Sequence, residues 1–142
     1  MNFASVNILS ILIAGAAAWI FGAIYYGVLG KQWMAAQGKT MDQCKQEQAG
    51  KSRVAFFAPF VLALVGALIM AWVLYGILVH LNSFTPRAGM ISGALCWFGF
   101  VLTSLTVNNA FGGRKAMLTV IDSIHWLGGL LIIGTILGWM GR

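Results

Sequence analysis

The chain has 142 residues, of which 60% are hydrophobic and only 8% are charged. Soluble globular proteins carry roughly a quarter of their residues as charged side chains, so this composition excludes a water-soluble fold. The net charge of +6 comes from nine Lys and Arg residues that are scattered over the chain and form no basic face with interleaved aromatic residues. Nucleic acid is therefore not an expected partner, and the lipid bilayer is.

Four apolar segments are each long enough to cross about 30 Å of hydrocarbon as a helix that rises about 1.5 Å per residue. They lie at about residues 6–29, 54–79, 88–110 and 116–140. The sequence therefore predicts an all-α fold, in which residues 1–142 form a single membrane domain built as a bundle of four transmembrane helices. The third and fourth helices are expected to form a tight hairpin.

Residues 30–53 form the only hydrophilic segment of any length. Thr40 followed by Gln43 resembles a capping box, so we expect a short interfacial helix to begin there and to end near Gly50. The segment is too short to be a separate domain.

The basic residues also predict how the chain sits in the membrane, because Lys and Arg in short loops are retained on the cytoplasmic side. The first and third loops carry five and two of them, and the rest of the chain carries Arg87 and Arg142. We therefore expect both hairpin loops inside and both termini outside, in a bacterial inner (plasma) membrane.

Small residues recur four positions apart in three of the helices, which lets helix backbones approach closely. The pattern predicts close packing without identifying the partner helix of any row. The rows are Ala14, Ala18 and Gly22, then Ala63, Ala67 and Ala71, and finally Gly134 with Gly138.

Asp122 is the residue that the hydrophobic pattern does not explain, since it lies about 9 Å into the fourth helix. An ionisable group at that depth is a candidate functional residue and needs a polar partner. His125 is three residues further on the same helical face, and Asn108 is the candidate from the neighbouring helix. We expect Asn108, Asp122 and His125 to form an intramembrane polar cluster.

Two interpretations of this cluster remain open. A carboxylate beside an imidazole can exchange protons near neutral pH, which predicts a proton or small-solute relay that uses Asp122 and His125. The same residues can instead hold helices together by hydrogen bonds, and packed membrane proteins retain such groups for structure alone. The structural interpretation is favoured.

No cofactor and no metal ion are expected. Cys44 lies in a polar loop and Cys96 in a hydrophobic helix, so both are interpreted as free thiols. His80 and His125 lie on the order of 20 Å apart in depth by helix rise, which argues against a haem held by both. No phosphate loop, nucleophile elbow or second buried carboxylate is present, so we do not expect an enzyme.

Two stretches carry a family resemblance. One contains Tyr25, Tyr26, Gly30, Lys31, Trp33 and Met34, and the other contains Asn108, Phe111, Gly113, Arg114, Leu118, Ile121 and His125. They resemble the bacterial family named domain of unknown function 1761, over essentially the whole chain. The resemblance implies a four-helix inner-membrane protein and no substrate, and we take Tyr25, Tyr26 and Arg114 as supporting residues of the site.

The chain departs from the pattern of that family at two positions. Gly112 stands where the family often has an acidic residue, so Arg114 is expected to lack that partner, and Ile124 stands where an aromatic residue often precedes the histidine. We expect a structural or accessory component that packs with copies of itself or within a larger membrane complex. The alternative is a minimal proton or small-solute conduit.

Overall fold

A computed structural model of the chain describes residues 6–141, and this part is all-helical. Its four long helices are α1 (Ile8–Ala36), α3 (Arg53–His80), a third helix over Pro86–Phe111 and α6 (Ala116–Met140). Each is long and apolar enough to cross a membrane. The predicted fold class is confirmed, and the helices indicate a multi-pass membrane protein.

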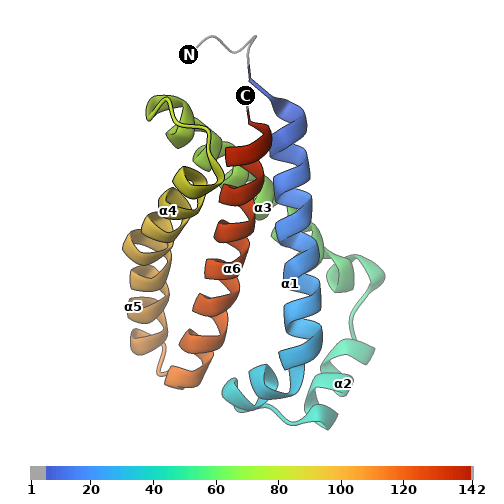
Figure 1. Cartoon of the computed structure of the whole chain (residues 1–142). Coiled ribbons are helices and arrows are strands. Elements are labelled where there is room, and N and C mark those ends of the chain that lie inside the picture. Colours follow the sequence, from blue (N-terminus) through green and yellow to red (C-terminus); the bar gives the residue numbers. More distant parts are fainter. Residues whose placement is uncertain (1–5, 142) are drawn as a thin grey trace.

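The helix α6 lies at the centre of the bundle, with α1 on one side, the third long helix on the other and α3 behind (Figure 1). The start of α1 and the end of α6 lie at one end of the bundle, and the polar helix α2 (Met41–Ala49) and the turn before α6 lie at the other. This arrangement places the first and third loops together. Which end faces the cytoplasm stays a prediction.

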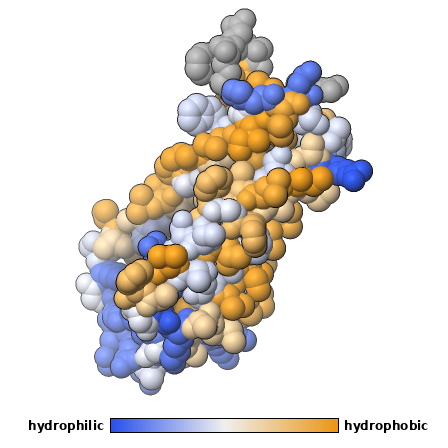
Figure 2. All heavy atoms as spheres, turned by 90° about the vertical axis from the view of Figure 1, so that its left-hand side faces the viewer, coloured by the Kyte–Doolittle hydropathy of each residue, from blue (hydrophilic) through white to orange (hydrophobic). Residues whose placement is uncertain are grey.

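The surface of the bundle is mostly hydrophobic along its length, and hydrophilic residues gather toward its two ends, with the larger group at the lower end in Figure 2. Large apolar side chains remain exposed on all four long helices, including Ile24, Leu62, Phe98 and Val120. In water this much exposed apolar surface would drive aggregation, whereas lipid tails solvate it without cost.

The first long helix extends further than the sequence predicts, because α1 ends at Ala36 instead of near residue 29. Lys31 and Gln32 are polar but exposed, so they do not interrupt the helix. The two added turns carry Trp33 alongside α6. This extension is what completes the site described below.

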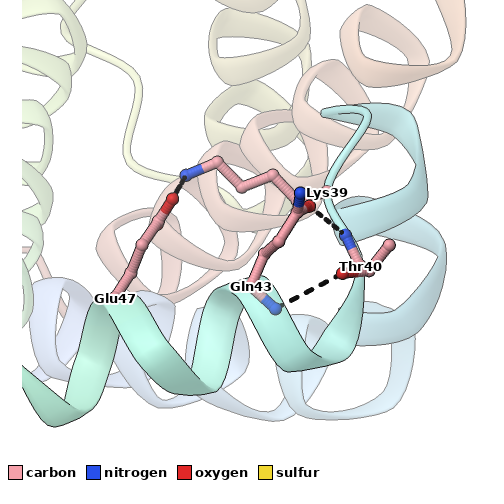
Figure 3. A network of polar contacts seen from close by, with 4 residues as sticks. All are labelled: Lys39, Thr40, Gln43 and Glu47. Carbon is pink, nitrogen blue, oxygen red and sulfur yellow. Dashed lines mark hydrogen bonds and ion pairs between the residues drawn. The ribbon is translucent and has the colours of Figure 1, made fainter.

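The predicted capping box is confirmed at the start of α2 (Figure 3). The backbone N–H of Gln43 donates to Thr40 Oγ1 at 3.3 Å, and the backbone N–H of Thr40 donates to Gln43 Oε1 at 2.9 Å. Gly50 caps the other end as expected. Lys39 lies beside this cap and forms an ion pair with Glu47 at 2.6 Å.

The third long helix is interrupted at its middle. It consists of α4 (Pro86–Cys96), the π-helical segment η2 (Trp97–Leu102) and α5 (Thr103–Phe111). At this segment Trp97 Nε1 donates to the backbone oxygen of Ser123 on α6 at 2.7 Å. A π turn holds one residue more than an α turn, so it rotates the following helix by roughly 100°. This rotation determines which face of α5 contacts α6.

Glycines on α4 and α6 let these two helices come into direct backbone contact. A Cβ atom at Gly89 would clash with the carbonyl oxygen of Gly134, and one at Gly138 would clash with that of Thr85. One at Gly93 would lie 2.6 Å from the Leu130 oxygen. The small-residue pair of the fourth helix therefore packs against α4, which the sequence alone did not identify.

We predict that Gly134→Val separates α4 from α6 and lowers the free energy of unfolding by roughly 1–3 kcal/mol, because the added side chain has no space. Gly66→Val is the matched control, since nothing lies within 4 Å of a Cβ at Gly66. Unfolding of both variants in detergent micelles measures the difference. Equal stability of the two would contradict the close approach.

We also predict that protonation of Glu47 breaks its ion pair at a lower pH than an isolated glutamate would require. The hydrogen bond from Lys39 lowers the pKa of Glu47, so the pair is present above the ordinary pKa of glutamate and is lost as the pH falls through the lowered value. An NMR titration should show the pKa of Glu47 rising in Lys39→Gln and staying nearly constant in Lys45→Gln. An unchanged pKa in Lys39→Gln would refute the pair.

Candidate functional site at the junction of α1 and α6

Asp122 on α6 is held by two hydrogen bonds from α1. Its Oδ1 accepts from the Tyr26 hydroxyl at 2.7 Å and from the Trp33 indole Nε1 at 3.0 Å. Tyr26 and Trp33 are seven residues apart, about two helical turns, so they project from one face of α1. A carboxylate in an apolar helix thus obtains two donors from its neighbour, and hydrogen bonds to an ionised acceptor are the stronger kind.

Two more hydrogen bonds join the same helices and use backbone oxygens as acceptors. The Tyr25 hydroxyl donates to the oxygen of Ile121 at 2.9 Å, and Lys115 Nζ donates to the oxygen of Ala35 at 3.1 Å. The second of these bonds lies at the end of α1, so the helices are linked over several turns. We call these four hydrogen bonds, made by Tyr25, Tyr26, Trp33 and Lys115, the polar seam between α1 and α6.

His125 lies one turn beyond Asp122 on α6, in a shell of aromatic rings. Its ring is stacked on Phe21 at 6.1 Å between centroids and lies 4.8 Å from the ring of Tyr26. Trp126 packs edge-on at 4.9 Å. Tyr26 therefore contacts His125 with its ring and Asp122 with its hydroxyl, which makes it the link between the two residues.

The imidazole of His125 has room because α1 carries a glycine opposite it. A Cβ at Gly22 would lie 2.7 Å from His125 Nε2. The opposite ring nitrogen, Nδ1, is buried and has no hydrogen-bond partner among residues 6–141. Buried polar atoms are nearly always paired, so an unpaired imidazole nitrogen in a membrane helix is an unusual feature of this junction.

A cavity of about 550 Å³ lies next to this seam, between α1, α3 and α6. Tyr26, Trp33 and His125 form part of its wall. Asp122 is not among the residues that line it, although both of its aromatic donors are. The Asp122 carboxylate thus has its hydrogen-bond partners within the bundle, whereas the His125 imidazole borders the cavity.

The structure brings Asp122, His125, Tyr25 and Tyr26 together and leaves Asn108 outside. Asn108 is exposed, and no described residue bonds its side chain. Its neighbour makes the bond that joins these helices, because Asn109 Nδ2 donates to Thr119 Oγ1 at 2.9 Å. The predicted cluster was wrong in this member, since the π-helical segment turns position 109 instead of 108 toward α6.

Arg114 also lies apart from the seam. It is exposed and lines a smaller cavity between α5 and α6, with Thr106 and Thr119. Among the described residues it forms no ion pair. It is not a partner of Asp122.

Trp33 is the member of the site that the sequence analysis missed as a partner of Asp122. It lies in a stretch assigned to the polar loop, and its place in the family pattern was the available signal. Within residues 6–141 no three His, Cys, Asp or Glu residues come close enough to hold a metal ion. His80 is exposed at the far end of α3, where its Nδ1 contacts the oxygen of Gly76 at 2.8 Å.

Comparison with known proteins gives one match. The family model described as "Protein of unknown function (DUF1761)" matches residues 9–138, nearly the whole chain, which confirms the resemblance seen in the two motifs. No curated protein and no solved structure matches the chain. The site must therefore be interpreted from its own geometry.

We predict an energetic coupling between Tyr26 and Asp122 of about 0.5–2 kcal/mol in a double-mutant cycle of Tyr26→Phe and Asp122→Leu, because each change removes one side of a hydrogen bond. Tyr25→Phe is the matched control, since its hydroxyl donates to a backbone oxygen that Asp122→Leu leaves in place. Unfolding in detergent measures all variants. Additive effects of Tyr26→Phe and Asp122→Leu would show that the bond contributes nothing.

Proposed function

We propose that this chain, which belongs to the DUF1761 family of proteins of unknown function, is a non-enzymatic structural or accessory component of a bacterial inner membrane that packs with itself or within a larger membrane complex. The observation that carries this proposal is a pair of polar residues, Ser104 and Asn108, on the outer face of α5.

These two residues are four positions apart, so they lie on one face of the helix. Both are exposed, and no described residue bonds their side chains. The nearby Thr103 and Thr106 are exposed too, but their hydroxyls donate to carbonyl oxygens of their own helix at 2.7 Å. Polar side chains in membrane helices usually pair across a helix interface. An interface with a further helix would satisfy Ser104 and Asn108.

The position of this pair fits such an interface. The third long helix lies on the outside of the bundle (Figure 1), and its side of the molecule is largely hydrophobic (Figure 2). Phe98, Phe100 and Val107 supply exposed apolar surface there. An apolar face with two polar positions is a usual pattern of a helix–helix contact in lipid, where the polar pair fixes the register.

The hydrogen bonds at Asp122 support the same interpretation. A carboxylate that accepts from both Tyr26 and Trp33 has its partners within the chain, as a residue that joins helices requires. The conduit hypothesis keeps one observation in its favour, because His125 lines the 550 Å³ cavity. It would need Asp122 to reach that space, and Asp122 is not among the residues that line the cavity.

We predict that native mass spectrometry of the protein, extracted from native membranes in mild detergent, finds it assembled with copies of itself or with other membrane proteins. Asn108→Leu should weaken the assembly by about threefold or more, since one interhelical hydrogen bond is worth ~0.6 kcal/mol. Thr103→Val, whose hydroxyl is satisfied within its own helix, should have little effect. Extraction of single chains only, with a proton flux in liposomes that Asp122→Asn abolishes, would favour the conduit instead.

A further inference from the structure

The cavity between α1, α3 and α6 is within the size range of small-molecule sites, at about 550 Å³. Small residues on all three helices leave this space open: Ala18, Gly22, Ala63, Ala67 and Gly129. Phe60 and Ala63 on α3 belong to its wall and are exposed at the surface of the bundle, so the cavity is reached from the side that faces lipid.

Aromatic rings form much of the wall. They come from Trp19 and Tyr26 on α1, Phe60 on α3 and Trp126 on α6, with Trp33 near one end. Three of these rings use their polar atoms elsewhere, because Trp19 Nε1 donates to the Phe60 oxygen at 3.0 Å and Tyr26 and Trp33 donate to Asp122. The cavity therefore presents mainly the faces of aromatic rings to a ligand. None of the lining residues is Asp, Glu, Lys or Arg.

His125, like Trp126, is a lining side chain with unused hydrogen-bonding capacity. Neither ring nitrogen bonds a described residue, and Nδ1 is buried away from any partner. In a neutral imidazole one nitrogen donates and the other accepts. Buried Nδ1 has no partner in either tautomer, so Nε2, at the edge beside Gly22 and the cavity, is the nitrogen that can meet a ligand, and it donates when it carries the proton.

We propose that this cavity is a binding site for a neutral, lipid-soluble ring compound that carries a carbonyl oxygen, of which a quinone is the simplest example. The flat ring stacks between the aromatic side chains, where offset stacking adds to the burial of apolar surface. The carbonyl oxygen accepts from His125 Nε2, which gives the imidazole the partner that it lacks. The ligand enters from the bilayer past Phe60 and Ala63.

An alkyl-substituted benzoquinone is a suitable probe, because quinones quench tryptophan fluorescence and Trp19, Trp33 and Trp126 line the cavity. It would be titrated into full-length protein in phosphatidylcholine nanodiscs. We expect a saturable quenching component with one quinone per chain. Ala63→Phe should abolish it by filling the mouth of the cavity, and His125→Phe should weaken it about three- to tenfold by removing one hydrogen bond.

Ile69→Phe is the matched control for Ala63→Phe, since it adds the same ring to an exposed position of α3 that does not line the cavity. It should bind the quinone like the wild type. Quenching that never saturates, or that is equal in wild type and Ala63→Phe, would overturn the proposal. So would a saturable signal that a saturated alkane of similar length displaces fully, because an acyl chain would then be the natural occupant.

Discussion

A carboxylate within an apolar helix must find hydrogen-bond donors inside the protein, and this requirement at Asp122 organises the centre of the bundle. The donors come from Tyr26 and Trp33, so α1 must lie against α6 and must stay helical as far as Ala36. The bond from Lys115 to the Ala35 oxygen then fixes the end of the longer helix. A lone intramembrane charge is costly, but a charge with two donors holds two helices in register.

A second constraint, steric and not polar, acts in the other half of α6. There Gly134 and Gly138 meet the backbone of α4, and no side chain larger than hydrogen fits. One helix is thus bound on one side by hydrogen bonds to α1 and on the other by backbone contact with α4. On α1, Gly22 leaves room for the His125 side chain, whereas Gly134 and Gly138 on α6 leave room for a helix backbone. Small residues of these helices therefore differ in role.

Much of the fold could be predicted from composition, because apolar runs and a lone aspartate need no tertiary information to recognise. The hydrogen-bond partners of Asp122 could not be predicted from the sequence. Trp33 follows Lys31 and Gln32, and these polar residues made that stretch look like a loop when they are only the exposed side of a helix. Asn108 and Asn109 are adjacent in sequence, and the π-helical segment that ends six residues before Asn108, held where Trp97 bonds α6, determines which one faces inward.

The central claim, that Asp122 joins α6 to α1 through its two donors, is tested most directly by hydrogen exchange of the assigned indole N–H groups in lipid nanodiscs. The Trp33 N–H should exchange far more slowly than that of exposed Trp139, and it should lose this protection in Asp122→Leu. A Trp33 N–H that exchanges as fast as that of Trp139 in the wild type, or that stays protected in Asp122→Leu, would contradict the account.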